Sequence, residues 1–305
     1  MTRNHLIAWA FSGLIGLSGV QAAHACAFHG YTPSMTFVDL LLDTEQVVEA
    51  RLSPNDPTGF VPVETLLGPE VAEIPIAASA LVSSALQDRP ERTVLLARDG
   101  AYGPWREITI LDSHFRDLVD VVIARQSHWQ LGADTDRVQV FAGLVNNANP
   151  NMRRLALQEL DRAPYHVLKK TNLPDVRNLT HDPEVADQSL RPIRILLAGL
   201  TGDQRYVPLV ADGLAQAVNR DIGYTGAYAT ALIELSGTEG VAIIRDTYLR
   251  QSNLPDVTRD RLLQALAIQY RSADADVRRF ITQEVAELSR SIPGFREAAA
   301  LQFGF

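Results

Sequence analysis

The pattern of apolar and polar positions changes once along the chain, near Asp112. Before that residue, short apolar stretches with alternating polar positions are separated by Pro, Gly, Asn and Asp, as in half-buried strands joined by turns. The stretches are QVVEARL (46–52), FVPVETLLG (60–68), EIPIAAS (73–79), TVLLARDG (93–100) and WREITILD (105–112). They predict a small barrel or sandwich of five strands, preceded by a short helix at 38–42.

After Asp112 the apolar residues recur with the 3.6-residue period of a helix. In the segment 114–129 they fall on one face, which predicts a helix there. Further segments of this kind follow to the end of the chain, and short loops rich in Pro, Gly, Asp and Asn separate them. Their expected N-caps are Asp134, Asn149, Thr238 and Asp274.

Two pairs of segments in the helical part repeat each other. MRRLALQEL (152–160) and VRRFITQEV (277–285) have their apolar positions, Arg-Arg and Gln-Glu in register. LAGLTGDQRYVPLVADGL (197–214) and LIELSGTEGVAIIRDTYL (232–249) both follow the order helix, Gly turn, helix. A single helix pair cannot cover its own apolar face, whereas stacked pairs can, so the repeats predict an α-solenoid.

The segments NPNMRRLALQEL and DADVRRFITQEV resemble HEAT repeats, whose second helix often opens with Asp-x-x-Val-Arg. The resemblance covers roughly residues 134–291, and the whole chain resembles exported bacterial proteins that contain HEAT repeats. It implies that Arg153 and Arg278 bond backbone or acidic groups of the adjacent repeat. The neighbouring Arg154 and Arg279 are then expected to be exposed.

The N-terminal strands have a resemblance of their own. VVEARL and FVPVETLLGP resemble the strand pair that opens exported OB-like domains of the netrin and metalloproteinase-inhibitor type. Members of that class can begin with an N-terminal Cys. Their disulfide partners are absent here, so zinc chelation by a terminal amine is not carried over. The predicted domains are a β-rich, OB-like domain at 26–112 and a HEAT-like domain at 113–305.

The first residues predict export. A basic start at Arg3 is followed by the uncharged apolar run LIAWAFSGLIGLSGV (6–20), which is too short to span a bilayer. We interpret residues 1–25 as a signal peptide, with cleavage before Ala23 or before Cys26. No later stretch is apolar enough to predict an integral membrane span. The protein is therefore expected to be periplasmic or secreted.

Cys26 is the only cysteine of the chain, so it cannot form an internal disulfide. A lone thiol in an oxidising compartment indicates intermolecular pairing, metal binding or burial. Together with His29, and with His24 if cleavage spares it, Cys26 offers soft or borderline ligands for copper or zinc. A lipid anchor at Cys26 is disfavoured, because Ala23 stands where lipoprotein signals usually have Leu.

Composition narrows the range of partners. The chain has 305 residues, of which 46% are hydrophobic, so two domains with buried cores are expected. Without residues 1–25 it keeps 27 basic and 36 acidic residues, a net charge of −9. An acidic balance of this size argues against nucleic acid or an anionic membrane surface as the main partner.

Other polar residues are more typical of structure than of chemistry. Glu159 and Asp161 are expected to solvate a helix face, and PYHVLKK (164–170) is expected to be a solvated helix end. Trp105 is interpreted as a plug of the small barrel. The sequence contains no nucleophile elbow, phosphate-binding loop or His-Glu-x-x-His motif.

The sequence thus predicts an α+β multidomain protein, with a small N-terminal β-barrel or sandwich followed by a HEAT-like α-solenoid. The expected function is that of an exported, non-catalytic interaction protein. It would bind an unidentified protein or peptide partner through its helical-repeat surface, without a cofactor. The alternative is a periplasmic metal- or thiol-handling protein that uses Cys26 and His29, with weak metal binding.

Overall fold

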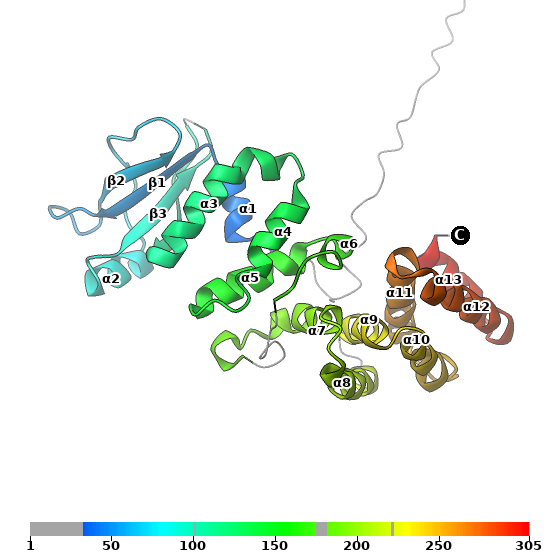
Figure 1. Cartoon of the computed structure of the whole chain (residues 1–305). Coiled ribbons are helices and arrows are strands. Elements are labelled where there is room, and N and C mark those ends of the chain that lie inside the picture. Colours follow the sequence, from blue (N-terminus) through cyan, green and yellow to red (C-terminus); the bar gives the residue numbers. More distant parts are fainter. Residues whose placement is uncertain (1–32, 101, 175–181, 221–222, 305) are drawn as a thin grey trace, which may run out of the picture.

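The computed structural model describes residues 33–100, 102–174, 182–220 and 223–304. The protein is elongated, with a β-sheet at one end and a row of helices that leads away from it (Figure 1). The strands are β1 (Gln46–Leu52), β2 (Phe60–Leu67), β3 (Thr93–Arg98) and β4 (Arg106–Leu111). They form one antiparallel sheet in the order β2-β1-β3-β4.

The mixed α and β architecture is confirmed, but of the predicted barrel or sandwich the barrel is wrong, because the sheet is open, and the described strands form no second sheet. The segment 73–79, one of the five segments predicted as strands, does not form a strand. It makes one isolated bridge, between Ile74 and Phe60. Ser79 then caps helix α2 (Ala80–Asp88) by accepting a hydrogen bond from the Val82 amide. With a helix at this place, no described strand connects β4 back to β2.

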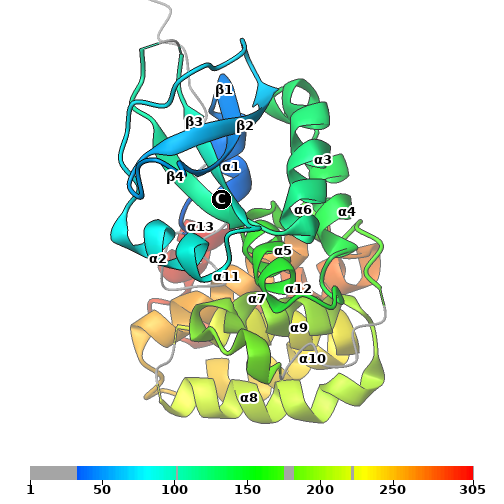
Figure 2. The ribbon, with the colours of Figure 1, turned by 90° about the vertical axis from the view of Figure 1, so that its left-hand side faces the viewer.

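Both faces of the sheet are covered, because consecutive residues of β1 and β3 are buried and consecutive side chains of a strand point to opposite faces. Val48 and Leu96 face the side on which α2 packs. Their neighbours Val47 and Leu95 face the side of α1 (Phe37–Leu42) and α3 (Ser113–Gln130). Figure 2 shows the sheet with α1 and α3 beside it.

The helices after α3 follow the segments that the 3.6-residue period predicts, and α13 is added to them. They are α4 (Asp134–Ala142), α5 (Pro150–Arg162), α6 (Tyr165–Leu168), α7 (Arg191–Leu200), α8 (Val207–Asn219), α9 (Thr225–Ser236), α10 (Thr238–Ile244), α11 (Asp256–Ser272), α12 (Ala275–Ser291) and α13 (Phe295–Phe303). A π-helical turn at Arg245–Leu249 extends α10. Of the expected N-caps, Asn149 caps α5 with its side chain, and Asp274 holds the N-cap position of α12 without a side-chain bond. Asp134 and Thr238 are the first helical residues instead.

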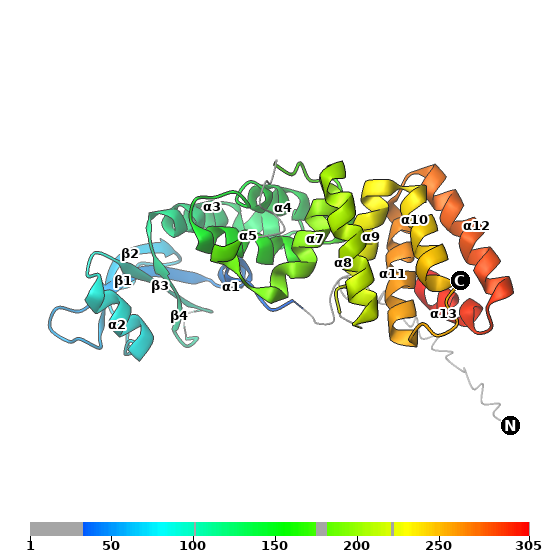
Figure 3. The ribbon, with the colours of Figure 1, turned by 90° about the horizontal axis from the view of Figure 1, so that it is seen from below.

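Each helix of the row packs mainly on its neighbours. Helix α7 packs on α9, α9 on α11 and α11 on α13, while α8 lies against α9 and α10 packs on α12. Figure 3 shows this succession from the sheet to the C-terminus. Among the described helices, none is both long and apolar enough to cross a membrane.

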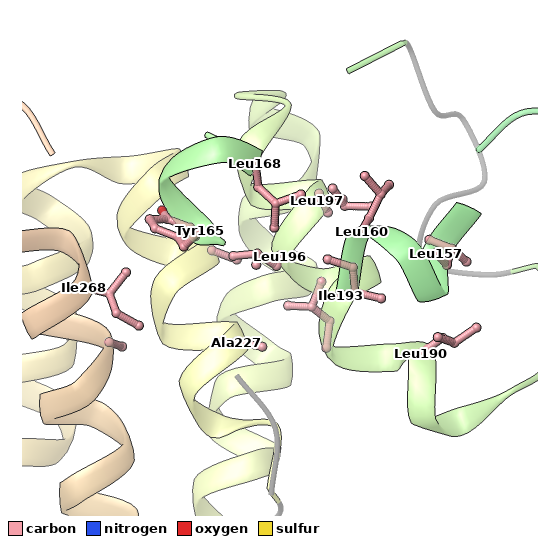
Figure 4. Packing of buried hydrophobic residues seen from close by; sticks show 14 of the residues in the cluster. Leu157, Leu160, Tyr165, Leu168, Leu190, Ile193, Leu196, Leu197, Ala227 and Ile268 are labelled. Carbon is pink, nitrogen blue, oxygen red and sulfur yellow. The ribbon is translucent and has the colours of Figure 1, made fainter. Parts of the chain in front are cut away.

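One buried apolar cluster runs through the molecule, from Val47 in the sheet to Phe303 in α13. Figure 4 shows its middle, where Leu160 of α5 lies beside Ile193 and Leu197 of α7. Farther along, the helices come so close that a Cβ atom at Gly199 would lie 2.6 Å from the Cα of Ala231. The absence of a side chain at Gly199 therefore permits the contact of α7 with α9.

Candidate functional site

The metal or thiol site predicted from the sequence involves Cys26 and His29, which lie outside the described residues. So does the predicted signal peptide, residues 1–25. These expectations stay predictions. In the part of the chain that the structure describes, no group of three or more His, Cys, Asp or Glu side chains could hold a metal ion.

The most concentrated charge in the described interior is a cluster around Arg137 of α4. Its Nη2 lies 2.7 Å from Oδ1 of Asp39 in α1, and its Nε donates to Oε2 of Glu159 in α5 at 2.8 Å. A second guanidinium, that of Arg162, lies with its Nε 2.9 Å from the other Asp39 oxygen. Only 2% of the Glu159 side chain is exposed. The cluster thus joins α1 to α4 and α5, two consecutive helices that are distant from it in sequence.

Burial affects the two carboxyls of this cluster differently. It raises the pKa of Glu159 above its ordinary value, and the charge of Arg137 offsets only part of this effect. Burial would also raise the pKa of Asp39, but hydrogen bonds from the Thr36 amide and Arg137 outweigh it, so that pKa is lowered. Oε1 of Glu159 is buried and meets no donor of the described part in hydrogen-bonding geometry.

The burial of Glu159 and Asp161 corrects the expectation that both solvate a helix face. Helix α5 packs against α4 on one side and α7 on another, so little of its surface remains for solvent. A cavity of about 230 Å³ adjoins the cluster and is lined by Asp134 as well. The guanidinium of Arg137 binds the carboxylates of both Asp39 and Glu159. The arrangement is therefore suited to holding α1, α4 and α5 together.

A second buried polar network surrounds Glu234 of α9. Its Oε1 accepts hydrogen bonds from Lys169 Nζ and Gln269 Nε2, each at 2.7 Å, and from the Tyr165 hydroxyl. Burial, followed by the charge of Glu234, raises the pKa of Tyr165. PYHVLKK is therefore not simply a solvated helix end: Tyr165 is buried and Lys169 is an ion-pair partner. His166 and Lys170 are exposed as expected.

The arginines singled out by the repeats bond backbone or acidic groups, but the carbonyls that they bond belong to their own helix pair and not to the adjacent repeat. Arg153 Nε donates to Oδ2 of Asp182 at 2.8 Å, and its Nη1 donates to the Asn147 and Ala148 carbonyls. Arg278 Nη2 donates to the Ala273 carbonyl at 3.1 Å. In both places the arginine bonds carbonyls of the turn that precedes its own helix.

Trp105 lies in the apolar cluster between the sheet and α2, which agrees with a structural role but not with a barrel plug. The guanidinium of Arg98 stands over its ring, 4.7 Å from the centroid.

A groove of about 670 Å³ runs beside β4, where the sheet meets the helical row. The strand contributes residues 107–111, while α2 contributes Leu81 and Val82. On the other side the groove is lined by Arg154, Leu155 and Gln158 of α5. It is larger than the cavity at Glu159 and contains both apolar and polar side chains. The sequence did not indicate this groove, because its walls come from α1, α2, β4, α3 and α5, which meet only in the folded chain.

Comparisons with protein-family models, with curated proteins and with solved structures found no match to this chain.

The raised pKa of Glu159 predicts a pH-dependent stability difference between the wild type and Glu159→Gln. The folded state takes up the Glu159 proton at a higher pH than the unfolded chain, so protonation favours folding. The wild type should gain stability relative to the variant as pH falls through the raised folded-state pKa toward the ordinary value of 4.5. Urea unfolding at several pH values between 7 and 4 measures this difference.

The exposed Glu297→Gln on α13 serves as the control, and its difference from the wild type should not follow the curve of Glu159→Gln. Parallel stability profiles of the wild type and Glu159→Gln would contradict the burial argument.

The Glu234 network predicts that substitutions of the two lysines of the chain, Lys169 and Lys170, change the free energy of unfolding by different amounts. Lys169→Met removes the cation bonded to Glu234 and should lower the free energy of unfolding by about 1–2 kcal/mol. Lys170→Met makes the same chemical change one residue later, at an exposed position, and should alter stability by less than about 0.5 kcal/mol. Denaturant unfolding of both variants is the measurement, and equal effects would exclude a stabilising role of Lys169.

Proposed function

We propose that the protein is an exported, non-catalytic interaction protein that binds protein or peptide partners through the surface of a HEAT-like α-solenoid. The observation that carries this proposal is the order of packing along the row, in which α7, α9, α11 and α13 follow one another and α10 packs on α12. Arrays of this kind expose long continuous surfaces, and they are used mostly to bind other macromolecules.

The two repeat arginines support a solenoid. Arg153 stands near the start of α5, the second helix of the pair α4 and α5. Arg278 holds the same place in α12, the second helix of the pair α11 and α12. Both bond carbonyls of the turn inside their own pair. The same contact at two distant places is what repetition of one structural unit produces.

Export is proposed from the sequence alone, on the uncharged apolar run 6–20 and the small residues that follow it. A secreted or periplasmic partner is therefore the kind to search for. The net charge of −9 without residues 1–25 favours a protein partner over nucleic acid.

Site-specific photocrosslinking in the envelope of the native host tests this function. A photoreactive residue is placed at one of three exposed apolar positions of the row, Leu209 in α8, Val257 in α11 or Leu301 in α13. Each is a minimal change because the native side chain is already exposed. At least one position should give a defined protein adduct, since a partner that lies along the row must cover part of it.

The matched control carries the photoreactive residue at Asn55, in the exposed turn between β1 and β2. It should not give the adduct found on the row. If all three helical positions give no adduct, or give only those of Asn55, the proposed function is wrong.

A further inference from the structure

The two edge strands of the sheet are protected to different degrees. The edge at β2 contains Pro62, has two register shifts against β1, and is bridged at Phe60 by Ile74. Proline, bulges and covering segments are the usual means by which proteins prevent strand addition. The opposite edge is β4, which contains no proline and has one register shift against β3, and no described residue pairs with its outer side.

The outer side of β4 is also the floor of the groove described above. Figure 2 shows β4 at the margin of the sheet, close to α2. Leu81 of α2 projects beside the groove with 79% of its surface exposed, and Leu155 of α5 lies buried at the other wall. An extended chain placed here would find backbone partners on one side and apolar surface on the others.

The charged groups of the groove are not equally available. Its carboxylates are already acceptors: Glu107 Oε1 accepts from the Ser79 amide at 2.7 Å, and Asp112 Oδ1 accepts from the Phe115 amide at 3.0 Å. Arg92 and Arg154 form no ion pair or hydrogen bond through their guanidinium groups with any residue the structure describes. The charge of Arg154 contributes to lowering the pKa of Asp187, but the two are not bonded. The groove therefore presents free cationic donors.

We infer that β4 accepts an extended acidic segment of a partner protein as a fifth strand, with carboxylates of that segment bonded to Arg92 and Arg154. The inference goes beyond the proposed function, because it places a separate binding surface at the sheet and gives its partner a chemistry. Backbone bonds to β4 supply affinity without regard to sequence. The two guanidinium groups, which bind carboxylates in a fork geometry, supply the selection for acidic residues.

Selection from a displayed library of random ten-residue peptides tests this inference with the protein lacking residues 1–25. The enriched peptides should be rich in Asp and Glu, and their affinity is then measured by fluorescence anisotropy. The double variant Arg92→Gln/Arg154→Gln should weaken binding about tenfold or more, because two charge-assisted bonds are lost. The matched control Arg279→Gln, at an exposed arginine of α12, should leave binding unchanged.

Two further measurements identify the binding mode. An enriched peptide is made in two forms, one methylated at its odd-numbered and one at its even-numbered backbone nitrogens. One of the two forms should not bind, because methylation removes the N–H donors that pair with β4. Hydrogen exchange should slow at residues 106–111 when the unmodified peptide is bound.

The inference fails if no peptide is enriched, if enriched peptides bind the double variant as well as the wild type, or if both methylated forms bind as well as the unmodified peptide. Protection of 106–111 that depends on protein concentration without peptide would show that a second copy occupies the edge instead. These results leave the proposed function untouched, because its adducts form on α8, α11 and α13. Conversely, peptide binding at β4 without any adduct on the row would support the groove and contradict the solenoid surface.

Discussion

The guanidinium of Arg137 is the contact on which the arrangement of the molecule depends. It lies between Asp39 of α1, the helix that leads into the sheet, and Glu159 of α5, which begins the helical row. A buried ion pair contributes little net stability, but losing one partner costs about 3–5 kcal/mol, because the other charge remains buried. We therefore expect Arg137 to fix the position of the sheet relative to the helices rather than to add much to the stability of either part. The groove beside β4 takes one wall from each part, so its shape depends on how the two parts are held together.

Apolar packing extends the same constraint along the chain. The cluster that begins at Val47 continues through α5 and α7 to Phe303, so each helix is held by its neighbours (Figure 4). The close approach at Gly199 and the hydrogen bonds to Glu234 fix the spacing of α7, α9 and α11. A row held in this way can present a surface of constant shape to a partner, and binding then requires little ordering of the protein itself.

The sequence predicts this architecture well where the information is local. The alternation in QVVEARL and TVLLARDG locates two strands, although it predicts only half-buried ones, and the period after Asp112 locates the helices. A capping bond between the Val82 amide and the Ser79 side chain starts α2. The sequence analysis missed this start, because the alternation in EIPIAAS predicts a strand there. The burial of Glu159 depends on its ion pair with Arg137, which lies 22 residues away in sequence. Arg137 in turn bonds Asp39, from which it is separated by 98 residues. A local signal existed even so, because Glu159 lies four residues after the buried Leu155, on the same helix face. The groove left no such signal, since its walls meet only in the folded chain.

Differential scanning calorimetry of the protein without residues 1–25 tests most directly whether the sheet and the helical row form one body with a fixed groove between them. A continuous core and the Arg137 contact predict a single transition whose calorimetric and van't Hoff enthalpies agree. Two separate transitions, or a calorimetric enthalpy well above the van't Hoff value, would contradict this account. The sheet and the row would then be independent units, and the groove between them would not be a fixed binding surface.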